Sequence, residues 1–484
     1  MSEDNLKTSV LSSLFWKFLE TGGVTGIQFI VQIILARLLL PEDYGVVALI
    51  IVFITISQVF VQSGLGTALI QKKEVTDTDY SSVFYLTLGI AVIFYVILFI
   101  AAPAIAAFYN QPLITMVLRV LGLSLFFGSV NSIQNAVIAR NFQFKKLFIS
   151  SLGAVVISGV VGVSMAYLGY GVWALVMQQL ASIGSLCLFM WFTVKWRPKR
   201  QFSLTRVKKL FAFGWKLLVS GLIDVTYTNL STLIIGKIYP AGMLGYYTKG
   251  QEFPMTVMST MNSSIQAVML PAYAKNQDNR PAVKEIMRRA LVSSSFLVFP
   301  AMAGLAVTAE PLVLLLLTDK WLMCVPFIQI FCAVYALWPI HTVNLQALNG
   351  IGRSDIFLKL EIVKKLLGLF VLGITVFMGI YAMALGMVFT GIIGTFINSY
   401  PNKKLLGYSF REQWRDLLPS LILSLLMGGI VYSILFIGLP VWLTLILQIS
   451  VGIAVYMGLA RVLKLEAFTY LLNTMKEYLP KKKV

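Results

Sequence analysis

Apolar runs of roughly 20 residues follow one another along almost the entire chain. A helix must hold about 20 mostly apolar residues to cross a bilayer. Hydrophobic residues make up 58% of the sequence and charged residues only 12%, more apolar surface than a water-soluble fold of 484 residues can bury. The alternating pattern of a membrane β-barrel is not found in these runs. The sequence therefore predicts an all-α integral membrane protein.

About fourteen transmembrane helices are predicted by this length criterion. Their approximate ranges are 13–36, 45–70, 80–106, 113–138, 147–168, 172–194, 210–236, 244–270, 290–309, 321–348, 356–378, 381–400, 417–437 and 441–462.

Two distant stretches, 16–45 and 215–245, carry the same pattern. Each begins with Trp-Lys, continues as an apolar helix and closes with a basic residue, Arg37 in the first and Lys237 in the second. In both, a glycine follows eight positions after that basic residue. A membrane protein that repeats itself in this way is typically built from two homologous helix bundles.

The repeat continues beyond its opening motif, because segment 169–175 matches segment 379–385 and Asn131 matches Asn344 within similar surroundings. Six helices thus recur as six, followed by two further helices. Because six is even, both halves enter the membrane from the same side, which predicts a pseudo-two-fold axis along the membrane normal. The predicted domains are a six-helix bundle at 1–200, a second one at 201–405, and two extra helices with a basic tail at 406–484.

Basic residues gather in alternate loops, and these loops indicate the orientation. They occupy 72–73, 140–146, 195–209, 272–289, 353–365, 403–415 and the tail 481–483. The intervening loops contain few basic residues. Positively charged loops remain cytoplasmic, so both termini are predicted inside the cell, with 238–243 and 312–320 outside. The net charge of +19 is then a consequence of topology, and no nucleic-acid partner is expected.

Several chemistries find no support in the residues. Cys187, Cys324 and Cys332 fall inside predicted spans without the spacing of metal ligands, and His341 is the single histidine. No Gly-rich phosphate loop followed by Lys-Ser or Lys-Thr occurs. We therefore expect no metal, no cofactor, no catalytic residues and no enzymatic activity.

The most informative residues are polar groups within predicted spans, because charges at membrane depth are costly and usually face a cavity. The seventh span carries Lys216, Ser220, Asp224 and Ser231 on one helical face. Elsewhere, polar or charged side chains interrupt the first, second, fourth and eighth spans. These are Lys17, Glu20, Gln28, Gln58, Gln62, Arg119 and Glu252.

Each of these residues also has a structural explanation. Lys17 and Lys216 can extend to the headgroups, and Arg37 and Lys237 can anchor the opposite interface. Glu20 can pair with its neighbouring lysine, and Ser, Thr and Gln side chains often join transmembrane helices. Asp224 is too far along its helix from Lys216 for a direct pair, roughly 12 Å at ~1.5 Å per residue.

Four segments carry a family resemblance. Residues 35–45 (Leu-Ala-Arg-Leu-Leu-Leu-Pro-Glu-Asp-Tyr-Gly) resemble the first hairpin of bacterial polysaccharide flippases, and 229–237, 270–275 and 319–321 resemble the colanic-acid-exporter branch. The similarity extends over essentially the whole chain. It implies membership of the multidrug/oligosaccharidyl-lipid/polysaccharide exporter superfamily and a place in the bacterial cytoplasmic (inner) membrane.

The resemblance implies a cargo of undecaprenyl-diphosphate-linked oligosaccharide, moved from the cytoplasmic to the periplasmic leaflet by alternating access and driven by an ion gradient. We expect a cationic cavity for the diphosphate, carboxylates that couple the ion, and polar residues that line the cavity. The expected cations are Arg37, Lys17, Arg119, Lys216 and Lys237; the carboxylates are Asp224, Glu20 and Glu252; the polar residues are Gln28, Gln58, Gln62, Ser220 and Ser231. Further expected partners are membrane lipids and the polysaccharide polymerase and export machinery, and we expect a monomer.

Two alternatives remain open from the sequence. A cation-coupled multidrug extruder of the same superfamily would prefer an acidic, aromatic cavity to a basic one. A membrane polysaccharide polymerase or ligase would need acid-base residues on sizeable loops, and the loops of this chain are short.

Overall fold

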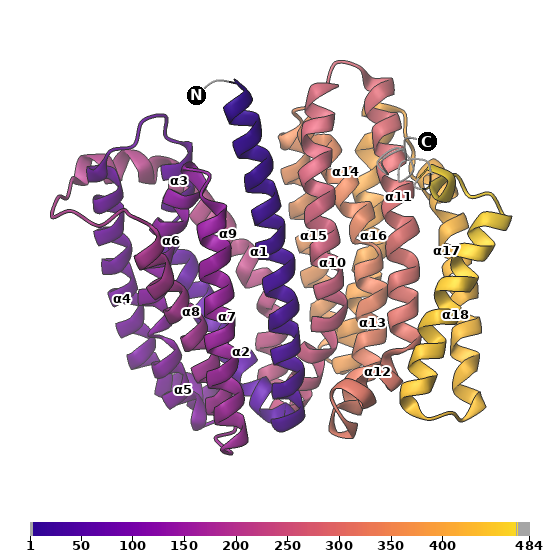
Figure 1. Ribbon diagram of the computed structural model, residues 1–484, viewed down its shortest axis with the longest axis horizontal. Coiled ribbons are helices and arrows are strands. Elements are labelled where there is room, and N and C mark those ends of the chain that lie inside the picture. Colours follow the sequence, from indigo (N-terminus) through magenta and orange to yellow (C-terminus); the bar gives the residue numbers. More distant parts are fainter. Residues whose placement is uncertain (1–2, 471, 473–484) are drawn as a thin grey trace, which may run out of the picture. The chain divides into compact units, whose positions relative to one another are not determined.

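The computed structural model describes residues 3–470 and 472, and the regular elements within them are helices (Figure 1). The predicted basic residues 481–483 lie outside the described part. The chain divides after Gly245 into two compact units.

In its described residues, the first unit contains nine helices, and a tenth begins near its end. They are α1 (Glu3–Leu38), α2 (Pro41–Gln62), α3 (Leu65–Gln71), α4 (Asp77–Tyr109), α5 (Leu113–Leu121), α6 (Ser124–Arg140), α7 (Phe144–Tyr167), α8 (Val172–Thr193), α9 (Leu204–Ile238) and α10 (Ala241–Lys275).

The second unit begins within α10. It continues with α11 (Arg280–Val307), α12 (Ala309–Leu316), the 3₁₀ helix η1 (Asp319–Cys324), α13 (Val325–Ala336), α14 (Trp338–Gly350), α15 (Ser354–Thr375), α16 (Ile380–Leu406), α17 (Phe410–Ser433), the 3₁₀ helix η2 (Ile434–Ile437) and α18 (Val441–Val462).

The prediction of an all-helical membrane protein is confirmed. Twelve stretches of the described chain are long and apolar enough to cross a membrane. The other two predicted spans, 244–270 and 356–378, form helices α10 and α15 but do not reach this apolarity. In α15 the reason is charge, since its sequence contains Asp355, Glu361 and three lysines, whereas α10 is rich in Ser, Thr, Asn and Gln.

Local sequence explains where several helices begin. Pro41 starts α2 without the loss of a hydrogen bond, because the first backbone N–H groups of a helix have no partner within it. Thr76 and Asp79 form a reciprocal capping box at the start of α4, and Ser409 and Glu412 do the same at α17.

Helix α9 packs along α2 within the first unit, which is why this unit extends to Gly245. Two glycines permit the close approach at one end. A Cβ atom on Gly45 would lie 1.8 Å from the carbonyl oxygen of Ala241, and one on Gly245 would lie 2.0 Å from that of Pro41. The two matching hairpin turns therefore contact each other reciprocally. The division of the repeat at residues 200 and 405 stays a prediction.

The fourth and tenth predicted spans are both broken. The first break separates α5 from α6 at residues 122–123, and the second separates α13 from α14 at Leu337. Asn131 and Asn344, which the sequence repeat matches to each other, lie in α6 and α14, the helices that follow these two breaks. Corresponding breaks in the two halves are consistent with the internal repeat.

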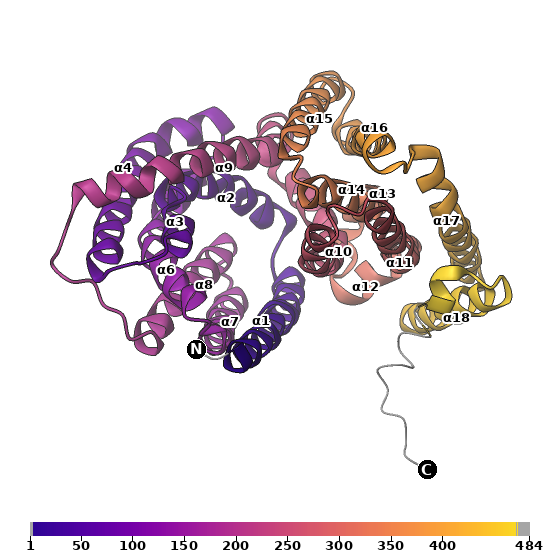
Figure 2. The same cartoon turned by 90° about the horizontal axis from the view of Figure 1, so that it is seen from above.

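In the second unit, α17 packs on α11 and α18 packs on α17; Figure 2 shows the last two side by side. A buried polar network joins α14, α16 and α17. Asn344 donates to Gln413 Oε1 at 2.9 Å, and Asn402 donates to Asn344 Oδ1 at 2.7 Å. Such amide pairs satisfy polar groups that apolar surroundings would otherwise penalise.

Candidate functional site: a polar cavity in the first unit

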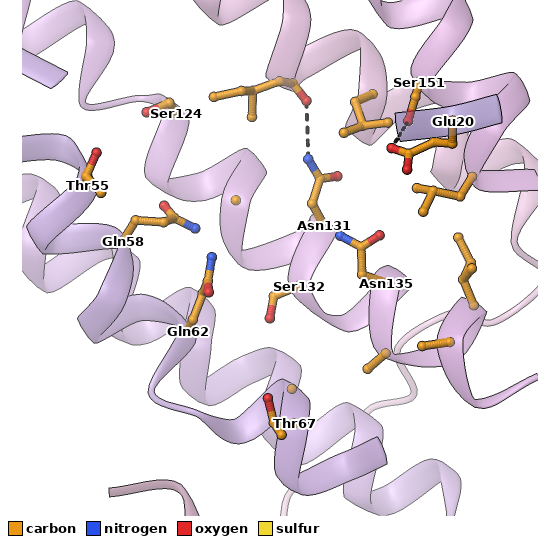
Figure 3. Close-up of a pocket in the computed structure, with 18 of the residues that line it drawn as sticks. Glu20, Thr55, Gln58, Gln62, Thr67, Ser124, Asn131, Ser132, Asn135 and Ser151 are labelled. Carbon is orange, nitrogen blue, oxygen red and sulfur yellow. Dashed lines mark hydrogen bonds between the residues drawn. The ribbon is translucent and has the colours of Figure 1, made fainter. Parts of the chain in front are cut away.

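A cavity of about 710 Å³ lies within the first unit, bounded by α1, α2, α3, α5, α6, α7 and α8 (Figure 3). Most of its polar lining is neutral. The neutral polar side chains are Thr55, Gln58, Gln62, Thr67, Ser124, Asn131, Ser132, Asn135, Ser151 and Gln179. Lys17 and Glu20 are the charged residues among those that line it.

Helix α2 supplies one wall. Thr55, Gln58 and Gln62 recur at helical spacing and therefore share the face that points into the cavity. Gly128 on α6 leaves room for the amide of Gln58, because a Cβ atom there would lie 2.2 Å from Gln58 Nε2. The sequence of α6 thus determines where this amide can lie.

Helix α6 supplies the facing wall, with Asn131, Ser132 and Asn135 directed toward the cavity (Figure 3). Asn131 is only 7% exposed, and its Nδ2 donates to the carbonyl oxygen of Ile183 at 3.4 Å. Its Oδ1 is buried without a hydrogen-bond partner among the described residues. A buried unpaired amide oxygen costs about 1–3 kcal/mol, so this atom would gain from a hydroxyl or water that enters the cavity.

The two charges of the lining form an ion pair. Lys17 Nζ lies 2.6 Å from Glu20 Oε2, on successive turns of α1, and Ser151 on α7 donates to Glu20 Oε1 at 3.4 Å. The side chain of Glu20 is 18% exposed and that of Lys17 is 49% exposed. The cavity therefore has little net charge and is chiefly a set of hydrogen-bond donors and acceptors.

Four of the predicted site residues meet in this cavity: Lys17, Glu20, Gln58 and Gln62. Glu20 pairs with its neighbouring lysine, the contact that its structural explanation describes, and its role in coupling stays a prediction. Gln28 lies exposed farther along α1, outside the lining.

The other predicted cations of the first unit lie outside this lining. Arg37 is exposed at the end of α1. Arg119 donates from Nε to the carbonyl oxygen of Phe99 at 3.2 Å, with its guanidinium 4.1 Å from the Phe99 ring centroid. Lys237 donates to the carbonyl oxygen of Phe108 and lies 4.3 Å from that ring centroid. These two cations are therefore engaged by neighbouring helices.

The polar face of α9 is also separate from this cavity. Lys216, Ser220 and Asp224 are exposed and Ser231 is partly buried, and none of them is part of the lining. Glu252 belongs to the second unit, where it pairs with the buried Lys249 at 2.8 Å.

Sequence reasoning missed the wall that α6 provides. Asn131 was named only as part of the repeat, and neither Ser132 nor Asn135 was predicted to line a cavity. The signal was available, because positions 128, 131, 132 and 135 share one helical face, with small or polar residues at each. The sequence analysis predicted one continuous helix over 113–138, whereas the structure has a break at residues 122–123, before α6 begins.

A family model described as "Polysaccharide biosynthesis protein" matches residues 34–326. The chain belongs to this family. This assignment confirms the resemblance to a polysaccharide-related family that the sequence indicated. The matched region includes α2 and α6, which form two walls of the cavity.

Two proteins of similar sequence have names that refer to polysaccharide pathways. The "Lipopolysaccharide biosynthesis protein WzxC" of Escherichia coli (strain K12) is 25% identical over 441 residues, 88% of each chain. The "Succinoglycan biosynthesis transport protein ExoT" of Rhizobium meliloti (strain 1021) is 25% identical over 353 residues, which cover 73% of this chain and 71% of the relative.

Solved structures share the fold of this polysaccharide biosynthesis family member. The "Lipid II flippase MurJ, inward closed conformation" superimposes with a TM-score of 0.75 at 16% identity, covering 93% of this chain and 98% of the other. An inward-facing multidrug resistance MATE family transporter gives 0.60 at 16% identity, covering 79% and 94%. At this identity the likeness concerns the fold alone.

Proposed function

We propose that this protein is a flippase, and not an enzyme, that moves undecaprenyl-diphosphate-linked oligosaccharide units from the cytoplasmic to the periplasmic leaflet. The observation that carries the proposal is the amide-lined cavity of about 710 Å³ inside a transporter-like membrane fold. Its size lies within the roughly 300–1,000 Å³ typical of sites that enclose small ligands.

The lining suits a sugar better than it suits a lipid tail or an apolar drug. Sugar hydroxyls both donate and accept hydrogen bonds, and so do the carboxamides of Gln58, Gln62, Asn131 and Asn135. The unpartnered Oδ1 of Asn131 offers an acceptor to a hydroxyl. A polar head that binds here is removed from the ~30 Å of hydrocarbon that it cannot cross unaided.

The diphosphate needs cations, and in this proposal most of them come from residues outside the cavity lining. Lys17 borders the cavity, while Arg37, Arg119, Lys216 and Lys237 lie on α1, α5 and α9. Charge-assisted hydrogen bonds from such groups are roughly twice as strong as neutral ones. Because Arg119 and Lys237 already contact carbonyl oxygens, their transfer to a diphosphate would require those contacts to break.

Alternating access between two six-helix halves, driven by an ion gradient, completes the proposal. Glu20 is the coupling candidate that borders the cavity, where it pairs with Lys17 and accepts a hydrogen bond from Ser151. Asp224 and Glu252 remain candidates outside it. In this proposal the protein is a monomer in the inner membrane, has both termini in the cytoplasm, and delivers its cargo to a polysaccharide polymerase and export machinery.

The proposal is tested in a host that lacks the gene. Wild-type protein should restore surface polysaccharide, whereas Asn131→Leu, which keeps the side-chain size but removes the amide, should restore little at equal protein abundance. Thr78→Val serves as the matched polar-to-apolar control, because Thr78 hydrogen-bonds Gln201 away from the cavity. Full restoration by Asn131→Leu, or equal loss in both variants, would contradict a sugar site at the cavity.

A further inference from the structure

A second hollow lies in the first unit, between α3 and the beginning of α9, on the side predicted to be cytoplasmic. Its volume is about 640 Å³. Three cationic residues line it, Lys72, Arg206 and Lys209, together with the apolar Leu210 and Phe213. The site is separate from the amide-lined cavity, since the two share no lining residue.

A buried carboxylate fixes two of these cations. Asp79 is 0% exposed, and its Oδ2 lies 2.7 Å from Lys72 Nζ and 3.4 Å from Arg206 Nη1. Arg206 also donates to Thr76 Oγ1 at 2.6 Å. Because this carboxylate pairs with two of the three cations that line the hollow, an excess of positive charge remains there.

The backbone around the hollow is fixed by side chains that do not line it. Arg140 donates to the carbonyl oxygens of Leu69 and Ile70, each at 3.2 Å, and to those of Lys72 and Lys73. At the start of α9, Ser203 N–H donates to Ser82 Oγ at 2.9 Å. The cationic groups thus project from two anchored segments, which lowers the entropy lost when they bind a ligand.

Apolar groups border the same hollow. Phe213 is 40% exposed and belongs to the lining, as does Leu210, and the exposed Leu204 lies in α9 between the lining residues Ser203 and Thr205. Exposed aromatic and aliphatic side chains beside basic ones are typical of the membrane–water interface. A ligand for this site therefore needs an anionic group joined to an apolar chain.

We propose that this hollow binds the phosphate group of a membrane lipid, with Lys72, Arg206 and Lys209 contacting the phosphate and the chain lying along Leu210 and Phe213. The assignment does not depend on the transport proposal, since it rests on the cations, the anchored backbone and the apolar border alone. Two lipids share the required chemistry: an anionic glycerophospholipid of the bilayer and a polyprenyl diphosphate.

Binding to the purified full-length protein in a neutral detergent is measured by native mass spectrometry. The probes are phosphatidylglycerol, undecaprenyl diphosphate, phosphatidylcholine and inorganic pyrophosphate. Lys209→Gln should weaken binding of the first two roughly tenfold, the loss expected for one charge-assisted contact. Lys208→Gln is the matched control. Lys208 is exposed and lies beside Lys209 but outside the lining, and its substitution removes the same charge.

The source of the phosphate follows from the ranking of the two anionic lipids. Tighter binding of undecaprenyl diphosphate would identify a site that receives a polyprenyl carrier, and tighter binding of phosphatidylglycerol would identify a bilayer-lipid site; either supports the proposal. Equal binding of phosphatidylcholine, binding of pyrophosphate as tight as that of the lipids, or equal losses in Lys208→Gln and Lys209→Gln would overturn it.

Discussion

Replacing Gly128 with alanine tests the amide-lined cavity without removing any of its polar groups. The new Cβ atom would lie 2.2 Å from Gln58 Nε2 and 2.7 Å from Gln58 Cδ, so the two side chains cannot both keep their places. The obstructing atoms belong to the end of a flexible side chain. Gln58 is therefore expected to move away, while the backbones of α2 and α6 stay in position.

The energies favour a folded protein with an altered site. A displaced glutamine costs about 0.5–1.5 kcal/mol if it must leave its preferred rotamer, and alanine in a helix gains about 1 kcal/mol over glycine. The two terms nearly cancel, so thermal stability should change little. Loss of one neutral hydrogen bond to the cargo, about 0.5–1.5 kcal/mol, should lower affinity about two- to tenfold.

The assay is polymer export in a gene-deletion host at subsaturating expression, with protein abundance measured alongside. Gly89→Ala is the matched control, because nothing lies within 4 Å of a Cβ atom at this α4 position. The double variant Gly128→Ala with Gln58→Ala should export no worse than Gln58→Ala alone, since the obstructed amide is absent. Wild-type export by Gly128→Ala would refute the argument that the position of this amide matters.

The remaining predictions concern packing, orientation, coupling and pH. Gly45→Ala should prevent stable folding or insertion, because its Cβ atom would meet the backbone of Ala241 at 1.8 Å and backbone cannot rotate aside; normal abundance would show that the contact is loose. In a background without native cysteines, labelling from outside should modify Ala241→Cys and spare Gln201→Cys, and the reverse result would invert the predicted orientation. Asp224→Asn should insert normally and transport poorly; wild-type export would make Asp224 a structural residue. The hydrogen bond from Arg288 lowers the pKa of Glu466 in the folded protein. This contact therefore stabilises the protein at pH values above the pKa of Glu466 in the unfolded chain, about 4.3, and the stabilisation is lost as the pH falls through the lower pKa of the folded state. The stability difference between wild type and Glu466→Gln should therefore shrink on acidification, and a difference that grows would contradict this sign.

The sequence predicted the features that depend on hydrophobicity and spacing. Apolar length identified the helices, and Gln58 and Gln62, two of the polar residues named in the second span, both line the cavity. The repeat matched Asn131 with Asn344, and both lie after a break in their span. The breaks themselves were missed, because hydropathy does not register a backbone interruption inside an apolar run.

The sequence could not predict where the side chains of isolated charged residues point. Arg119 and Lys237 are cations in or beside apolar runs, and both contact a carbonyl oxygen and a phenyl ring of α4. A single charge on a helix has no periodic partners that would indicate its face. The predicted span 356–378 also differs from the structure. It forms helix α15, whose charged residues leave it outside the twelve candidate membrane spans of the described chain.

The central claim is that this protein moves a lipid-linked oligosaccharide across a bilayer, and transfer in proteoliposomes measures it directly. Purified protein is reconstituted with undecaprenyl-diphosphate-linked oligosaccharide that carries a fluorophore on the sugar, and an impermeant quencher reports the outer leaflet. The account predicts that an imposed ion gradient makes nearly all of the fluorescence accessible with wild-type protein, more slowly with Asn131→Leu and not in protein-free vesicles. Accessibility that stays near half with folded, correctly inserted protein would contradict it.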